Sequence, residues 1–265
     1  MPDSETISIL TGKLIIGTLL FVRVMGFIAA GPFFRSLTIP NKVKILLALL
    51  LAFSITTAFW QEQPVIDFHL WYMVLLVLKE LMVGLSIGFV ANAVFWGARV
   101  AGGLIDFDLG FFTAAVFNID EGSPTILGDF QEMVVLMLFL ILNGHHFLIE
   151  GIYASVRAVP ITTFAFTDSS VQMFVKMATT VFIVGVKMAA PVIVAIFLTN
   201  LALALLARVA PQTNIFMLSF QLKIAVGLLI LFAASPMIVM VAKYALQGFE
   251  NDIMKFIMTL NPGRV

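Results

Sequence analysis

The chain has 265 residues, of which 61% are hydrophobic and 11% are charged, and its mean hydropathy is +1.09. Soluble domains are about half apolar and about a quarter charged, so this composition predicts an integral membrane protein. Fifteen basic residues balance fifteen acidic ones, which excludes a basic field for nucleic acid, and the absence of cysteine excludes disulfides, thiolate metal sites and cysteine nucleophiles.

Six segments approach the roughly 20 apolar residues that a membrane-spanning helix needs. They are residues 7–32, 45–60, 70–98, 133–149, 169–207 and 215–244. Several of them carry charges inside or at their ends. The sequence therefore predicts an all-α, multi-helix integral membrane protein with about six hydrophobic helical segments. The last two segments flank RVAPQTN (208–214) and should form a long helical hairpin.

The loops divide by charge. The connection 33–44 carries three basic residues and no acid, which places it in the cytoplasm by the positive-inside rule. Residues 61–69 carry two acids and no lysine or arginine, which places them outside.

Composition also changes near residue 168, because no acid follows Asp168 before residue 243. We therefore divide the chain loosely into residues 1–168 and 169–265.

A stretch in the middle of the chain, residues 99–132, differs from its apolar neighbours. It carries six carboxylates against a single base, Arg99, and its five glycines and one proline are typical of interrupted helices. Its centre nevertheless contains four phenylalanines. We expect irregular backbone with an apolar tip, enclosed by other protein. An ordinary cytoplasmic loop with one amphipathic helix is the open alternative.

A stripe of Glu80, Gly84, Gly88 and Asn92 repeats every four residues along one helix face. Two small residues four apart let another helix approach closely. Plain helix packing is the favoured interpretation, and a seam between subunits is the functional alternative.

Lys187 lies inside the apolar run 177–207, one turn before Pro191. Intramembrane charges are costly and usually face a bundle interior or water. A pore-lining or subunit contact and a position near the membrane interface both remain open.

The sequence offers no positive case for catalysis, a cofactor or a metal. His145, His146 and Glu150 are close in sequence, but the rest of a zinc-hydrolase signature is absent, as are phosphate-binding and nucleophile-elbow motifs. We expect these three residues to have a capping or packing role.

Several blocks together resemble one family. They are Arg23 with GPFFRSLTIPNKVKILLAL (31–49), LKELMVGLSIGFV (78–90), AGGLIDFDLGFFTAAVFN (101–118), LNGHH (142–146) and RVAPQTNIFMLSFQLKIAVG (208–227). In this order, across nearly the whole chain, they resemble the FliR family of the flagellar type III export gate and its virulence-secretion relatives.

The resemblance implies a non-enzymatic pore component in the bacterial inner membrane, at the flagellar basal body. Family members assemble with FliP and FliQ, and the pore passes unfolded flagellar proteins. Residues 1–168 would then be a FliP-like part and residues 169–265 a FliQ-like hairpin. A secondary transporter for small solutes is the alternative, although such transporters usually contain paired repeats, and an intramembrane enzyme is a third class.

The resemblance also implies two sites. The central loop, matched here by residues 106–122, would plug the pore, with Asp106, Phe107, Gly110, Phe111, Phe112 and Phe117 as its residues. The hairpin tip, with Pro211, Gln212 and Asn214, would meet the export switch protein FlhB.

Overall fold

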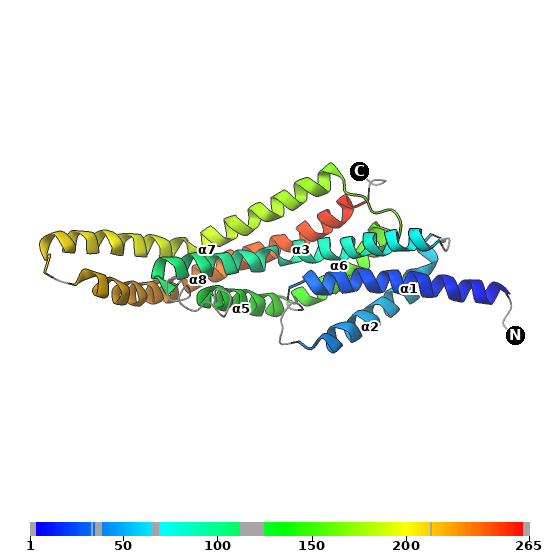
Figure 1. Cartoon of the computed structure of the whole chain (residues 1–265), viewed down its shortest axis with the longest axis horizontal. Helices are drawn as coiled ribbons and strands as arrows, with labels where there is room; N and C mark the ends of the chain where they lie inside the picture. Colours follow the sequence, from blue (N-terminus) through cyan, green and yellow to red (C-terminus); the bar gives the residue numbers. More distant parts are fainter. Residues whose placement is uncertain are drawn as a thin grey trace. The chain divides into compact units, whose positions relative to one another are not determined.

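The computed structural model describes residues 4–32, 34, 39–64, 69–111, 125–212 and 214–261. Within these ranges the chain forms helices and no strand, which confirms the all-α prediction. The elements are α1 (Ser4–Ala30), α2 (Asn41–Phe59), the 3-10 turn η1 (Trp60–Glu62), α3 (Leu70–Leu109), α5 (Ile126–Ile141), α6 (Gly144–Ala158), α7 (Asp168–Val209) and α8 (Ile215–Thr259) (Figure 1).

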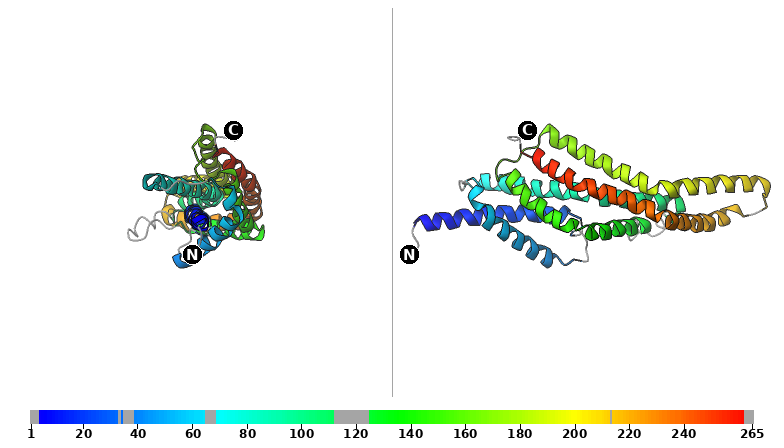
Figure 2. Two further views of the ribbon diagram at one scale, coloured as in Figure 1. Left: turned by 90° about the vertical axis from the view of Figure 1, so that its right-hand side faces the viewer. Right: turned by 180° about the vertical axis from the view of Figure 1, so that it is seen from behind.

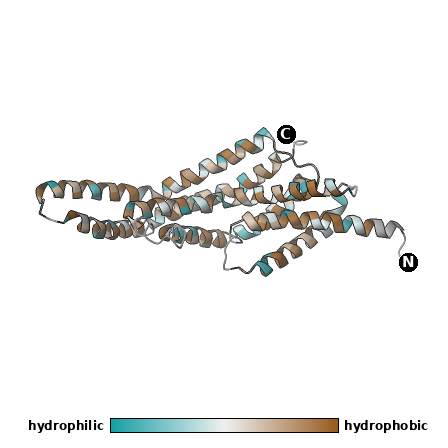
Figure 3. Ribbon diagram, in the orientation of Figure 1, coloured by the Kyte–Doolittle hydropathy of each residue, from teal (hydrophilic) through white to brown (hydrophobic). Residues whose placement is uncertain are grey.

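Five of these helices are long and apolar enough to cross a membrane, and the count is six if α5 and α6 together form one broken span. This agrees with the six predicted segments. Hydrophobic residues run along the length of each long helix (Figure 3). Helices α3, α7 and α8 contain 40, 42 and 45 residues, so each is roughly 60–68 Å long. That is about twice the ~30 Å thickness of a bilayer's hydrocarbon core.

Several predicted helix boundaries are wrong. Helix α3 continues past residue 98 to Leu109, and α8 continues past residue 244 to Thr259. The segment 133–149 is not one helix, because Asn143 takes a left-handed φ of 59° between α5 and α6. Asparagine is among the few residues that adopt this conformation readily. By contrast, Pro191 lies inside α7 without ending it, as membrane helices tolerate.

The chain divides into two compact units, and each is built from separate segments. The first unit contains Met1–Asn92, Asn143–Met177 and Gly248–Val265, and the second contains Ala93–Leu142 and Ala178–Gln247. The chain crosses from one unit to the other four times, and three of these crossings fall inside α3, α7 and α8. Neither unit coincides with residues 1–168 or 169–265. That division, drawn from composition and matched by the resemblance, stays a prediction.

In the first unit, α2 lies beside α1 (Figures 1 and 2), and the last turns of α8 close the core. Phe256 is fully buried and its ring centroid lies 5.0 Å from that of Phe174. The Thr167 hydroxyl donates to the Thr259 carbonyl at 2.8 Å, and Asn261 Nδ2 donates to the Ala158 carbonyl at 2.7 Å. These contacts explain why α8 extends beyond its predicted end at residue 244.

In the second unit, α3 packs closely on α7 and α8. A Cβ on Gly97 would lie 2.9 Å from the Val184 side chain, and Leu109 occupies the space that a side chain at Gly227 would need. Phe95 and Phe139 meet edge to face at 5.4 Å between ring centroids, which joins α3 to α5. This packing holds the end of α3, from which the chain enters the central loop.

Candidate functional site

The glycine stripe on α3 is covered by α1 of the same chain. A Cβ on Gly84 would overlap the backbone carbonyl of Arg23, and one on Gly88 would meet Ala30. Asn92 Nδ2 donates a hydrogen bond to the Ala30 carbonyl at 3.0 Å. This face therefore packs inside the chain, which leaves no room on it for the alternative of a seam between subunits.

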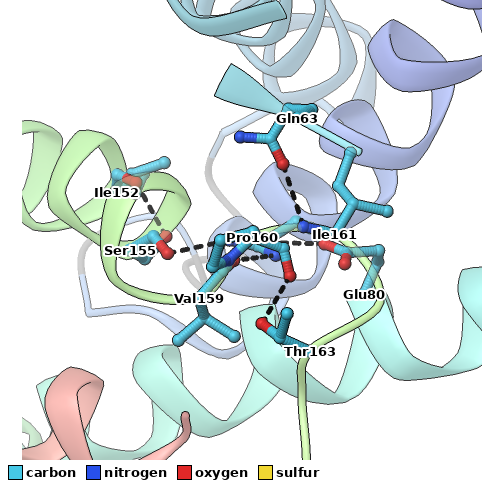
Figure 4. A network of polar contacts seen from close by, with 9 residues as sticks. Gln63, Glu80, Ile152, Ser155, Val159, Pro160, Ile161 and Thr163 are labelled. Atoms are coloured by element: carbon cyan, nitrogen blue, oxygen red, sulfur yellow. Dashed lines mark hydrogen bonds and ion pairs between the residues drawn. The ribbon is translucent and has the colours of Figure 1, made fainter. Parts of the chain in front are cut away.

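Glu80, the first residue of that stripe, forms a buried ion pair with Arg23 of α1. Arg23 Nε donates to Glu80 Oε2 at 2.5 Å, and the two side chains are 1% and 0% exposed. The other guanidinium nitrogens donate to the carbonyls of Ser155 at 3.0 Å and Val159 at 2.9 Å, at the end of α6. One guanidinium thus joins α1, α3 and α6, and its partners Glu80, Ser155 and Val159 lie together in Figure 4.

The segment that follows α6 is held by the same region. Ile161 N donates to Gln63 Oε1 at 2.9 Å, and the Thr163 hydroxyl donates to the Pro160 carbonyl at 2.9 Å (Figure 4). Thr162 takes a φ of 90°, which is strained for a β-branched residue. Such strain persists only where surrounding contacts over-determine the backbone, and these hydrogen bonds meet that requirement.

A second cluster lies where the central loop begins and ends, in the second unit. We call it the loop stem: Arg99, Gly102 and Asp106 of α3, with Leu127 and Asp129 of α5. Arg99 forms an ion pair with Asp129 at 2.5 Å. A Cβ on Gly102 would overlap the Leu127 backbone, so only glycine lets the two helices approach this closely.

The carboxylate of Asp106 caps α5 from a neighbouring helix. It accepts the Leu127 N–H, at 3.1 Å from Oδ2 and 3.3 Å from Oδ1, and Asp106 is 4% exposed. Thr125, which precedes α5, provides no side-chain cap. The first turn of a helix leaves N–H groups unpaired and favours negative charge, so Asp106 satisfies both needs and fixes α5 against α3.

The prediction of irregular backbone over residues 99–132 is wrong at both flanks. The structure places residues 99–109 in α3 and residues 126–132 in α5. Asp129 and Glu132 pair with Arg99, and Asp106 accepts an N–H at the start of α5. Residues 112–124 lie outside the described residues, and with them the expected apolar tip.

The proposed plug residues fall in three environments. Asp106 belongs to the buried stem, Phe107 is 67% exposed on α3, and Gly110 takes a φ of 87° where α3 ends. Phe111 is half-buried directly after that turn. Phe112 and Phe117 lie outside the described residues.

At the hairpin tip, Pro211 and Gln212 are exposed between α7 and α8. Asn214 is exposed as well, but its Oδ1 accepts the Met217 N–H at 3.3 Å. It therefore caps the first turn of α8, a role that sequence reasoning missed although asparagine is a preferred helix cap. Lys187 is exposed on α7.

The histidine pair packs ring against ring, with 4.2 Å between the centroids of His145 and His146. Within the described ranges, no three histidine, aspartate or glutamate side chains gather as metal ligands would.

Sequence reasoning missed the Arg23–Glu80 pair and the capping role of Asp106. The signal for the pair was present, since a lone arginine in one apolar segment and a lone glutamate in another each need a partner. Nothing in the sequence told which charge pairs with which.

Known proteins are similar to this chain over most of its length. The sequence matches the family described as bacterial export proteins, family 1, over residues 14–249. It is 33% identical to flagellar biosynthetic protein FliR of Bacillus subtilis over 229 residues, which cover 85% of this chain and 88% of that protein. It is 30% identical to FliR of Escherichia coli, covering 82% and 83%. It is 32% identical to Yop proteins translocation protein T of Yersinia pestis over 177 residues, covering 64% and 66%.

We predict that Glu80→Ala destabilises the protein by about 3–5 kcal/mol, because the Arg23 charge stays buried without a partner. The double variant Arg23→Met/Glu80→Leu should lose less stability than the two single variants combined, since it buries no charge. The melting temperature of the detergent-extracted protein measures this. Asp129→Ala is the control, since its pair with Arg99 is exposed and worth about 0–1 kcal/mol. Equal losses in Glu80→Ala and Asp129→Ala would contradict the assignment.

We also predict that Asp106→Ala speeds hydrogen exchange at the Leu127 amide roughly 2- to 30-fold, the range that corresponds to a lost helix cap. Asp106→Asn keeps an acceptor and should lie in between. Asp108→Asn, two residues along α3, serves as the control, because Leu127 donates to Asp106. An unchanged exchange rate in Asp106→Ala would show that the cap is dispensable.

Proposed function

Because the chain belongs to the family of bacterial export proteins, family 1, we propose that it forms, with FliP- and FliQ-like subunits, the gate through which unfolded flagellar proteins cross the bacterial inner membrane. The observation that carries this proposal is the match to flagellar biosynthetic proteins along more than four-fifths of both chains. Those relatives are named as flagellar or translocation proteins and not as enzymes, so we propose no catalytic role.

The apolar surface supports an assembly. Phe182 and Phe197 of α7 are 65% and 59% exposed, and Phe232 of α8 is 82% exposed. Large exposed apolar side chains continue towards both ends of these helices, as at Val171 and Val209. A bilayer covers only about 30 Å, which is half the length of either helix. The remaining apolar surface needs other protein to cover it.

The hairpin tip supports a separate contact. Pro211 and Gln212 are exposed polar or turn-forming residues at the end of two long apolar helices. We propose that they meet a FlhB-like switch protein in the cytoplasm. Asn214 contributes first to the cap of α8, so its substitution would test helix stability and contact together.

The loop stem supports a plug role for the segment between α3 and α5. Its two ends are fixed by an ion pair, a close backbone approach and the Asp106 cap. A plug requires a base at a fixed place, and the loop stem supplies one. A narrow apolar ring in a pore can exclude ions by dewetting.

Deleting the gene in its source organism tests the proposal. We expect no flagellar filament, retention of filament subunits in the cell, and rescue by the full chain. A tagged copy should co-purify with two further membrane proteins, one FliP-like and one FliQ-like. Normal filaments with loss of another set of secreted proteins would indicate a virulence-type apparatus. Normal protein export with a defect in solute uptake would favour the transporter.

For the plug, we expect Phe111→Ala with Phe112→Ala to leave gate assembly intact, to increase ion conductance across reconstituted bilayers and to slow growth when the gate is overexpressed. Phe130→Ala on α5 is the control, because that ring is 53% exposed and lies beside the stem. Unchanged conductance in a fully assembled double variant would mean that these rings only pack the loop.

A further inference from the structure

An open groove with a volume of about 650 Å³ runs between α1 and α2 in the first unit. This volume lies within the roughly 300–1,000 Å³ of pockets that hold small molecules. Its apolar lining comes from both helices and includes Leu10, Leu14, Phe21, Leu49, Phe53 and Trp60. Leu14 and Phe53 are each 72% exposed, so the chain itself leaves this lining uncovered.

The walls of the groove offer almost no polar group. Three threonines line it, and each hydroxyl already donates to a carbonyl of its own helix: Thr18 to Leu14 at 2.8 Å, Thr56 to Ala52 at 2.7 Å and Thr57 to Ser54 at 2.8 Å. An occupant that lies along these walls therefore needs no hydrogen-bonding groups of its own. A hydrocarbon chain meets that condition.

One end of the groove is positively charged. Lys13 lines it, with Nζ 4.3 Å from the centroid of the Trp60 ring. In the described part of the chain no carboxylate forms an ion pair with Lys13. Glu62, two residues after Trp60 in the sequence, pairs with Arg157, with 3.8 Å between its Oε2 and the Arg157 Nε. The lysine charge is thus available to an anion from outside the chain.

The groove has the length and the polarity of one membrane leaflet. Its lining runs from residue 10 to 21 on α1 and from residue 49 on α2 to Trp60 at the start of η1, roughly 16 Å along each side. A leaflet contributes about half of the ~30 Å hydrocarbon core. Tryptophan and tyrosine mark the water interface of a bilayer, and Trp60 stands at the charged end of the groove.

We propose that this groove binds a phospholipid with an anionic headgroup, whose acyl chain lies between α1 and α2 and whose phosphate faces Lys13. The lipid matches the single charge at one end of an otherwise apolar surface.

Native mass spectrometry of the full chain, extracted together with its export partners, tests the site. The probes are phosphatidylglycerol and phosphatidylcholine with identical acyl chains. We expect the wild type to bind phosphatidylglycerol roughly fivefold more tightly, the factor for about 1 kcal/mol per lysine facing an anionic headgroup. Lys13→Gln should remove this preference and Lys13→Arg should keep it. Lys243→Gln is the control, because that lysine is exposed on α8 outside the groove.

A second pair of variants distinguishes the contribution of the apolar groove to lipid binding from that of the Lys13 charge. A Cβ on Gly17 would make ordinary contact with Thr56, at 3.5 Å from its Oγ1, so the longer side chain of Gly17→Leu would extend into the groove. It should weaken binding of both lipids. Gly12→Leu on the same helix is the matched control, since nothing lies within 4 Å of a Cβ there.

Three results would overturn the proposal. The first is equal affinity of the wild type for the two lipids. The second is an unchanged preference in Lys13→Gln together with unchanged binding in Gly17→Leu. The third is loss of a partner membrane protein from the Lys13→Gln complex without any loss of lipid, which would identify the groove as a contact between subunits.

Discussion

Apolar helices packed together have few features that fix their register, and in the first unit the buried Arg23–Glu80 pair fixes it. Any slip of α1 along α3 would leave a charge buried without its partner, which is far less favourable than a shifted apolar contact. Gly84 admits the Arg23 backbone itself, so the close approach and the ion pair occur at the same point. Because the guanidinium also holds Ser155 and Val159, the position of α6 follows from the same pair.

Helix α3 repeats this arrangement in the second unit. Asp106 is a buried carboxylate, and Gly102, one turn earlier, admits the backbone of α5. The partners differ: Asp106 accepts an N–H from the N-terminus of α5, whereas Glu80 pairs with the guanidinium of Arg23. In each unit, one carboxylate and one glycine on α3 determine where a neighbouring helix lies. These contacts align α3 and α5, the two helices that the central loop joins in the sequence.

The sequence was sufficient for the helical class, for the number of hydrophobic segments and for the family, because these depend on composition, local periodicity and motif order. It was insufficient for helix ends, since Arg99 and the acids near it read as loop residues until their partners across space are known. The family resemblance implied a plug role for Asp106 but gave no sign that this residue is buried and accepts the Leu127 N–H. A carboxylate inside an apolar pattern signals a buried partner, but the partner comes from 21 residues away.

Hydropathy alone also does not tell whether an apolar surface faces lipid or protein, and helix length supplies the missing constraint. Helices α7 and α8 carry exposed phenylalanines over lengths that exceed a bilayer about twofold. Lipid can cover only part of that surface, so these helices require protein partners. The groove between α1 and α2 differs on the same criterion, because its length matches one leaflet and its single charge stands at one end. The length of an apolar surface and the position of its charges thus distinguish a surface that faces protein from one that faces lipid, although the two are equally hydrophobic.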